Sequence, residues 1–347
     1  MHIRSVAACL ALVALVACGD DDDDGSSTAT PTAATSTTAA AGPTSFTVPA
    51  PTTSAAPDST PVTSEAPDCR GTATIPHLDL QYQALPGVDP NLTSLDLYEP
   101  ERPEACGPAP IVVFVHGGGF SIGDKANKAQ DKARLFNDEG WLFVSVNYRL
   151  SPRPSALDDP DRVMFPDQNE DIAAALGWLE MHAAEHGGDP SKLMLMGHSA
   201  GAYLVAIQAT NASFNEAAGV PAGHVLCTVP LDTSAFRIDE AVGAGAAGSE
   251  IYRNAFGDDP QTWAAASPYD VATLDPPTGA FLVVSRGAGR VEANQRFVDH
   301  LVDLDVDASL LDAGTLTHAE VNAAVGQPGD TIVTPPLIAF LRTCATD

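Results

Sequence analysis

The five residues Gly197-His198-Ser199-Ala200-Gly201 decide the fold of this chain. They follow the apolar run 193–196 and precede the small, apolar segment 200–210, which predicts a strand before them and a helix after them. A strand, a sharp glycine-flanked turn and a helix are the setting in which a nucleophilic serine is presented. Ser199 is therefore the candidate nucleophile, and the small neighbours let the chain and a substrate approach it closely.

Apolar runs and helix-like stretches alternate along most of the remaining sequence. The predicted strands cover residues 80–82, 95–98, 111–115, 141–148, 193–196, 225–229, 280–284 and 308–311; the predicted helices cover 128–139, 171–186, 200–210, 294–304 and 332–343. This alternation predicts an α/β fold with a mostly parallel eight-stranded sheet and helices on both faces. Residues 236–268, after the sixth strand, are expected to form a small lid or excursion.

The N-terminal residues have a different character. Arg4 followed by an apolar core that ends at Ala17 predicts that residues 1–17 are a signal peptide, too short to span a bilayer. The sequence Leu15-Val16-Ala17-Cys18-Gly19 resembles a bacterial lipobox. We therefore expect export, with lipidation of Cys18 anchoring a lipoprotein to the outer face of the cell membrane. The alternative is an ordinary signal peptide with an incidental cysteine.

The next segment, residues 18–67, contains five consecutive aspartates at 20–24 and then almost only Thr, Ala, Ser and Pro. Such a composition cannot bury enough apolar surface to offset the entropy lost on ordering, and it predicts a disordered tether. Residues 68–347 are long enough for one sizeable catalytic domain with a single core.

Charge and cysteine content narrow the partners and the compartment. The formal net charge of −28 argues against nucleic acid and against direct adhesion to anionic lipid. Beyond the predicted lipidation site, an even number of cysteines remains, and an exported domain would pair them as two disulfides. The sequence does not choose among the three pairings, and a free buried thiol is an alternative for Cys227. The cysteines in question are Cys69, Cys106, Cys227 and Cys344.

A second motif, His116-Gly117-Gly118-Gly119-Phe120, follows the predicted strand 111–115. Ester hydrolysis develops a negative oxygen, which backbone N–H groups stabilise when no side chain blocks them. We expect the N–H groups of Gly118, Gly119 and Ala200 to form this oxyanion hole. A glycine turn without such a role is the alternative. Phe120 and the loop 149–166 are expected to shape the substrate pocket.

The general base should be a histidine that follows the nucleophile in the sequence. His318 follows the predicted strand 308–311 and is expected in the loop 314–318. His224 opens a predicted strand, and His300 lies on a predicted helix, so both are read as structural residues. His318 is therefore the candidate base.

These motifs together resemble an α/β-hydrolase of the hormone-sensitive-lipase-like carboxylesterase and arylformamidase group. The resemblance implies the α/β-hydrolase fold and an exported serine hydrolase that cleaves a small-molecule carboxylic ester through an acyl-enzyme, without metal or cofactor. An arylformamidase-type amidase and a non-catalytic surface binding protein are the alternatives, and nothing in the sequence indicates an oligomeric state. The resemblance covers roughly residues 80–345 through HGGGF (116–120), VNYRLSP (146–152), Pro166…Asp171…Trp178, GGDP (187–190), GHSAG (197–201) and THAEVN (317–322).

One departure from this family concerns the acid that orients the histidine. Family members usually carry an acidic residue, commonly an aspartate, shortly after the seventh strand, but here the segment 284–292 holds no aspartate, and an arginine stands about where one is expected. Asp232, after the sixth strand, is our preferred acid, and Glu292 is the alternative. The acid needs reach and hydrogen-bond geometry and not one fixed sequence position.

The segment His182-Ala183-Ala184-Glu185-His186 spells H-x-x-E-H, a zinc-binding pattern in some metallopeptidases. It ends a predicted helix ahead of the elbow strand, and no third ligand is apparent downstream. We therefore expect no metal from this motif.

Overall fold

The structure is a computed structural model, and it describes residues 67–243, 249–274, 277 and 279–346. The predicted signal peptide, Cys18 and nearly all of the predicted tether lie outside these described residues. They stay predictions.

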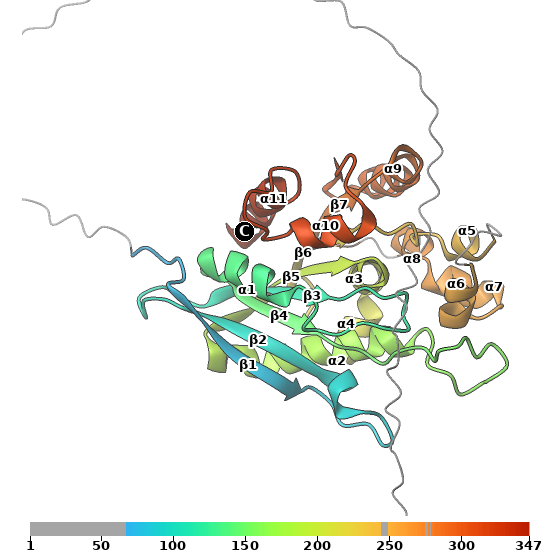
Figure 1. The fold of residues 1–347 in the computed structure, drawn as a ribbon, viewed down its shortest axis with the longest axis horizontal. Helices are drawn as coiled ribbons and strands as arrows, with labels where there is room; N and C mark the ends of the chain where they lie inside the picture. Colours follow the sequence, from blue (N-terminus) through green and yellow to red (C-terminus); the bar gives the residue numbers. More distant parts are fainter. Residues whose placement is uncertain (1–66, 244–248, 275–276, 278, 347) are drawn as a thin grey trace, which may run out of the picture. The chain divides into compact units, whose positions relative to one another are not determined.

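One eight-stranded sheet organises the described chain (Figure 1). The strands are β1 (Ala73–Gln81), β2 (Ser94–Glu101), β3 (Ala109–Val115), β4 (Leu142–Val146), β5 (Gly188–His198), β6 (Val225–Leu231), β7 (Ala280–Ser285) and β8 (Ala308–Asp312). Their order across the sheet is β1-β2-β4-β3-β5-β6-β7-β8. Only β2 runs against its neighbours within this sheet, so the predicted mostly parallel arrangement is confirmed.

Helices cover both faces of the sheet because successive side chains of a strand point to opposite faces. In β3, Ile111 and Val113 pack toward α2 and α3, whereas Val112 and Phe114 pack toward α1 and α11. The helices outside the excursion are α1 (Ala129–Asp138), α2 (Asp167–His182), α3 (Ala200–Thr210), α4 (Ala212–Ala217), α9 (Ala288–Asp303), α10 (His318–Ala324) and α11 (Thr334–Thr346).

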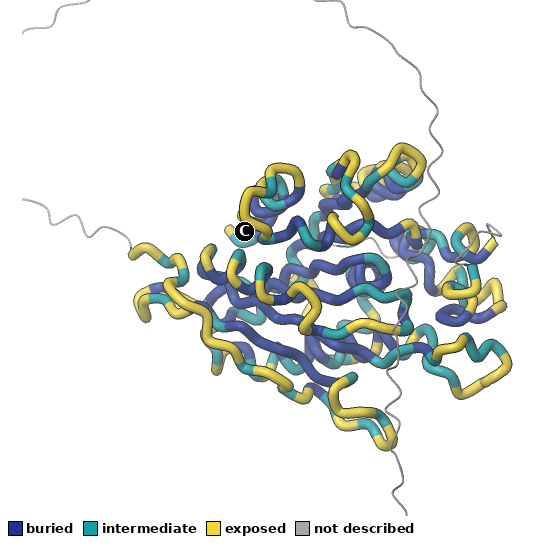
Figure 2. Tube along the Cα trace, viewed as in Figure 1, coloured by how far each residue is buried: buried dark blue, intermediate teal, exposed yellow. Residues whose placement is uncertain are grey.

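The outermost strand, β1, is longer than its apolar pattern predicts. The sequence indicated a strand only over residues 80–82, but β1 begins at Ala73 and pairs antiparallel with β2. Most of its residues are exposed, as Figure 2 shows along the outer edge of the sheet. An edge strand with both faces partly in water carries little hydrophobic alternation, which explains the difference.

The predicted excursion after β6 is confirmed, and it contains helices that its composition did not indicate. They are α5 (Ile238–Gly243), α6 (Ser249–Phe256), α7 (Pro260–Ala266) and α8 (Pro268–Leu274), beside the upper part of the sheet in Figure 1. Among the described residues, no helix is both long and apolar enough to cross a membrane.

Two disulfides resolve the pairing that the sequence left open. Cys69 pairs with Cys106, and Cys227 pairs with Cys344. The second bridge joins the buried strand β6 to the C-terminal helix α11, so Cys227 is not a free thiol.

Candidate active site

Ser199 occupies a strained turn between β5 and α3. Its backbone has φ 56° and ψ −115°, a region that non-glycine residues rarely enter. Its N–H donates to the carbonyl oxygen of Leu231 at 2.9 Å, which ties the turn to the neighbouring strand β6. A Cβ on Gly197 would collide with Gly201, and one on Gly201 would collide with the Val115 carbonyl. The flanking glycines are therefore required sterically for this turn.

His318 lies between the serine hydroxyl and a carboxylate. Ser199 Oγ is 2.9 Å from His318 Nε2, and His318 Nδ1 is 2.5 Å from Asp232 Oδ2. Because a carboxylate only accepts, Nδ1 carries the imidazole proton, and Nε2 is free to accept from the hydroxyl. The structure thus brings the three predicted residues into one hydrogen-bonded chain.

The local structure around His318 differs from the sequence expectation. His318 is the first residue of α10 and does not lie in a loop. Thr317 caps the helix: its hydroxyl accepts from the Glu320 N–H, and the Glu320 carboxylate accepts from the Thr317 N–H. This Thr-x-x-Glu pattern is a capping box, so the sequence did contain a signal for the helix.

Asp232 follows β6 and is held in a fully buried position. Its backbone N–H donates to Val284 O on β7 at 2.8 Å, and its side chain has no exposed surface. Arg286 Nε donates to Asp232 Oδ2 at 3.0 Å, the oxygen that also accepts from His318. Arg290 Nη1 lies 2.8 Å from Oδ1, so a second arginine forms an ion pair with the same carboxylate.

These neighbours keep Asp232 ionised despite its burial. Burial alone would raise the pKa of the Asp232 carboxyl, but the hydrogen bond from His318 and the charge of Arg290 outweigh that effect. The pKa of Asp232 falls from 3.8 to about 2. A buried carboxylate beside an imidazole can stabilise the imidazolium that forms when the ring takes a proton.

The alternative acid, Glu292, lies elsewhere. It is exposed on α9, and no hydrogen bond joins it to His318 in the described part of the chain. The structure therefore brings Asp232 and not Glu292 to the histidine. Arg286 comes directly after β7, as the sequence indicated, and it binds the carboxylate of the neighbouring strand.

His198 is a neighbour of the site that the sequence reading missed. Its Nε2 donates to the carbonyl oxygen of His318 at 2.9 Å, and the two rings lie 4.5 Å apart. Burial, with a further contribution from His318, lowers the pKa of His198 to about 3, so this imidazole is neutral at neutral pH. It occupies the variable second position of the Gly-x-Ser-x-Gly motif, which carries no pattern from which to infer a role.

The glycine loop after β3 passes directly beside the serine. A Cβ on Gly117 would come within 3.0 Å of Ser199 Cβ, so only glycine permits this approach. Gly118 has φ +124°, and a Cβ there would collide with the carbonyl of Ile122. The loop backbone is therefore pressed against the nucleophile with no side chain in between.

The three amides predicted to form the oxyanion hole lie on this loop and at the start of α3. Ala200 is the first residue of its helix, where an N–H has no intrahelical partner. Within the described residues, the N–H groups of Gly118 and Gly119 donate to no protein acceptor. Their role in binding a negative oxygen stays a prediction.

Phe120 closes the inner side of the glycine loop. It is 2 % exposed, and its ring makes edge contacts with Tyr203 of α3 and Phe256 of α6, at centroid distances of 5.6 and 5.3 Å. Helix α6 also reaches Gly119, where a Cβ would lie 3.2 Å from the Ile251 side chain. The excursion thus packs against the glycine loop, whereas direct substrate contact by Phe120 stays a prediction.

The predicted pocket loop, residues 149–166, is fixed at both ends. Arg149 donates to both carboxylate oxygens of the buried Asp171 at 2.9 Å and to Asp167 at 2.9 Å. At the other end, the Phe165 N–H donates to Ala255 O of α6 at 2.8 Å. These bonds attach the loop to α2 and to the excursion.

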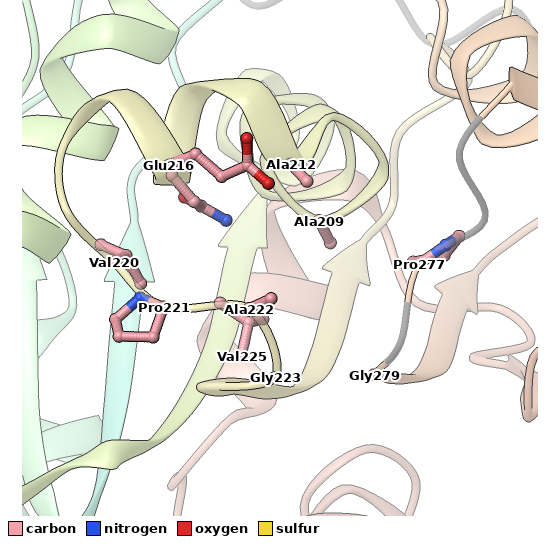
Figure 3. Close-up of a pocket in the computed structure, with 11 residues that line it drawn as sticks. Ala209, Ala212, Glu216, Val220, Pro221, Ala222, Gly223, Val225, Pro277 and Gly279 are labelled. Carbon is pink, nitrogen blue, oxygen red and sulfur yellow. The ribbon is translucent and has the colours of Figure 1, made fainter.

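A separate hollow lies at the opposite edge of the sheet, where β6 and β7 begin (Figure 3). It has no contact with Ser199 or His318, and its walls are mostly small and apolar. The lining residues are Ala209, Ala212, Asn215, Glu216, Val220, Pro221, Ala222, Gly223, Val225, Pro277 and Gly279.

The sheet and the Ser199–His318–Asp232 chain at its carboxyl edge define an α/β-hydrolase fold. Solved structures agree: esterase B from Lactobacillus rhamnosis superposes with a TM-score of 0.62 at 19% identity, over 80% of this chain and 88% of that one. A bacterial heroin esterase has a TM-score of 0.57 at 19% identity, over 80% and 85% of the two chains. At such identity, the likeness establishes the fold alone.

Sequence comparison covers the central part of the chain. The family model described as BD-FAE matches residues 95–234, which include the glycine loop, the elbow and Asp232 but not His318. A probable carboxylic ester hydrolase, LipM, of Mycobacterium tuberculosis is 32% identical over 33% of this chain. The para-nitrobenzyl esterase of Bacillus subtilis is 30% identical over 40% of it. The matched segments span only 25% and 29% of those two relatives' lengths.

Proposed function

We propose that this protein is a carboxylesterase-type serine hydrolase that works through an acyl-enzyme. The observation that carries the proposal is the continuous hydrogen-bonded chain from Ser199 Oγ through the His318 imidazole to the buried Asp232 carboxylate. Nucleophile, base and orienting acid in this order are what acyl transfer at neutral pH requires. The names of the relatives, carboxylic ester hydrolase and esterase, support the same reaction class.

In the first half-reaction, Ser199 Oγ attacks the ester carbonyl carbon while His318 Nε2 takes the hydroxyl proton. The collapse of the tetrahedral intermediate breaks the bond to the alcohol, which leaves with that proton from His318. In the second half-reaction, water attacks the acyl-serine and gives its proton to the same nitrogen. The collapse of this second tetrahedral intermediate breaks the bond between the acyl carbon and Ser199 Oγ, which takes the proton back from His318 as the carboxylic acid leaves.

The negative oxygen of each tetrahedral intermediate needs preorganised donors. We assign this role to the N–H groups of Gly118, Gly119 and Ala200. Their free donors, and the close approach of the glycine loop to Ser199, support the assignment. The wall of α6 and the loop 149–166 would then limit the size of the acyl or alcohol group.

A fluorophosphonate probe and p-nitrophenyl esters of acetate and butyrate test the proposal together. The wild type should react with the probe and turn over at least one ester. Ser199→Ala should lose labelling and about 10⁴-fold or more in kcat. Equal labelling of both proteins would reject the serine assignment, and ester turnover no faster than that of Ser199→Ala would favour a binding protein. Faster cleavage of a formanilide than of any ester would favour an amidase.

We also propose that the protein is exported and anchored through a lipid on Cys18. The two disulfides support an oxidising compartment, because such bonds persist outside the reducing cytosol. Growth with an alkyne-tagged fatty acid in a bacterial host tests the anchor. The wild type should incorporate the tag into the membrane fraction, and Cys18→Ser should not. Equal incorporation by both would reject the lipidation site.

A further inference from the structure

Three side chains with metal-ligating atoms meet at the outer strands of the sheet, away from the proposed active site. They are His77 on β1, Glu99 on β2 and His186 at the end of the short 3-10 helix η2 (Ala183–His186). One ligand atom from each lies within 4.8 Å of the other two. The two imidazole rings lie 4.4 Å apart, and both contact the same carboxylate.

The fold places these residues together through strand register and one tight turn. His77 is paired with Leu97 across the antiparallel β1–β2 ladder, so Glu99 is its diagonal neighbour on the same face. His186 reaches the pair from η2, which Gly187 then joins to β5 through a left-handed conformation of φ +71°. The donors thus come from three different elements.

We propose that His77, Glu99 and His186 form a zinc-binding site. Two ligand atoms bound to one tetrahedral zinc lie about 3.3 Å apart, given metal–ligand distances of about 2.0–2.1 Å. His77 Nε2 lies 3.1 Å and His186 Nδ1 lies 3.6 Å from Glu99 Oε2, values on either side of that spacing. Two imidazoles and one carboxylate are a donor set that zinc accepts readily.

The side chains are also accessible enough to load an ion from solvent. Their exposed fractions are 31 % for His77, 29 % for Glu99 and 18 % for His186, which leaves a direction open for a water as fourth ligand. The eleven-residue strand β5, about 33 Å long, separates His186 from Ser199. The ion would therefore fasten the edge strand β1 to the chain that enters β5, and it would take no part in ester chemistry.

The H-x-x-E-H motif contributes only one of its histidines to this site. The His182 ring stacks on Trp178 with 4.5 Å between centroids, and its Nδ1 lies 3.5 Å from Glu185 Oε1. These contacts stabilise the C-terminal end of α2. The expectation that the motif binds no metal rested on the missing third ligand downstream. The other two ligands of the proposed site lie upstream, at His77 and Glu99, where a linear motif gives no indication of them.

Zinc titration of the full chain, stripped of metal and kept in excess magnesium, tests the site. The wild type should bind one more zinc ion per chain than His186→Ala binds. Cobalt in place of zinc should give the visible absorption of a four-coordinate ion in the wild type but not in His186→Ala. His182→Ala is the matched control, because it removes the other histidine of the same motif and should keep the site. The wild type and His186→Ala share the run of aspartates 20–24, so a difference of one zinc ion between them cannot come from that run.

Thermal unfolding supplies a second readout. Zinc at a hundredfold excess over its Kd should raise the Tm of the wild type and of His182→Ala by about 5 °C. It should leave the Tm of His77→Gln and of Glu99→Gln nearly unchanged; His77→Gln, on an exposed edge strand, serves if His186→Ala does not fold. The proposal is overturned if the wild type binds no more zinc than His186→Ala, His77→Gln or Glu99→Gln. The three side chains would then be only a cluster of ion pairs. The proposal is also overturned if His182→Ala loses the ion.

Discussion

Two neighbouring strands of the sheet end in opposite charges. Asp232 follows β6, and Arg286 follows β7, and their side chains meet with 3.0 Å between Arg286 Nε and Asp232 Oδ2. In the family that the sequence resembles, the acid usually follows the seventh strand. The carboxyl ends of adjacent parallel strands lie at one edge, so a histidine there can receive its carboxylate from either strand. The position of the acid is therefore set by the reach of the side chain and not by the order of the motifs.

Removing the carboxylate that follows β6 should lower activity more than any other change at the ends of β6 and β7. Asp232→Asn keeps the size of the side chain but cannot hold the imidazole in the tautomer that accepts from Ser199. We expect kcat to fall by about 10⁴-fold. Steady-state kinetics on a p-nitrophenyl ester measures it. Glu292→Gln is the matched control and should keep wild-type activity; a comparable loss in that variant would contradict the assignment of Asp232.

Moving the acid from the end of β6 to the end of β7 should restore part of the activity. In Asp232→Asn/Arg286→Asp, the carboxylate stands shortly after β7, as in the family that the sequence resembles, and the partly buried arginine no longer faces an amide. We expect kcat to recover by about tenfold over Asp232→Asn alone, because the new carboxylate approaches the same ring with less favourable geometry. Asp232→Asn/Arg286→Asn removes the same arginine without supplying an acid. Equal recovery in both double variants would mean that relief of the arginine, and not the carboxylate, restores activity.

The features that the sequence predicts well are those specified by neighbouring residues. Ser199 and the glycine loop are local: a few consecutive residues specify a turn whose sterics are nearly unique. The eight-stranded sheet follows from the alternation of apolar runs and helices. An inner strand buried on both faces is apolar along its whole length, which makes it visible in the sequence. These features were therefore accessible before the structure.

Features that depend on distant pairings were not accessible in the same way. The choice between Asp232 and Glu292 depends on which side chain points at the ring, and Arg290, on α9, gives no sign that it faces Asp232. The sequence predicts only the end of β1, because hydrogen bonds to β2 hold this strand in place and its exposed residues show no apolar pattern. The helix that begins at His318 is different, because Thr317 and Glu320 form its capping box and are a local signal for it in the sequence.

The two arginines allow a pH test of the buried carboxylate. The folded-state pKa of Asp232, about 2, lies below its ordinary value of 3.8. Its stabilising contribution is therefore complete above pH 3.8 and is lost as the pH falls through about 2. Arg290→Met removes one of the opposing charges and should raise the pKa of Asp232, so acid unfolding should begin at a higher pH. We expect a loss of about 1 kcal/mol in the free energy of unfolding at neutral pH.

Acid titration followed by circular dichroism measures this shift. Arg296→Met, on the same helix α9, is the matched control, because Arg296 forms an ion pair with the exposed Glu240. It should change the stability by less than about 0.5 kcal/mol. An unchanged acid transition in Arg290→Met would show that Arg286 and His318 suffice to hold the carboxylate.

A second buried titratable group, on α1, has no expected effect on kcat. Lys132 of α1 has no exposed surface; its ammonium donates to Asn322 O of α10 at 2.9 Å and lies 4.7 Å from the centre of the Phe114 ring. Whereas Asp232 is met by two arginines, Lys132 is met by a carbonyl and a phenyl ring. Burial lowers the pKa of Lys132 from 10.5 to about 7.

The unfolded chain therefore binds one more proton than the folded chain between pH 7 and 10.5 at this residue. Stability should rise with pH across that window, by at most about 1.4 kcal/mol per pH unit, and the gain is lost as the pH falls through about 7. Lys132→Met should flatten this slope, and Lys128→Met, at the exposed start of the same helix, should keep it. Urea unfolding at several pH values measures the slope directly. An unchanged slope in Lys132→Met would contradict this assignment. It would mean that the hydrogen bond to Asn322 offsets the cost of burial and keeps Lys132 protonated in the folded protein.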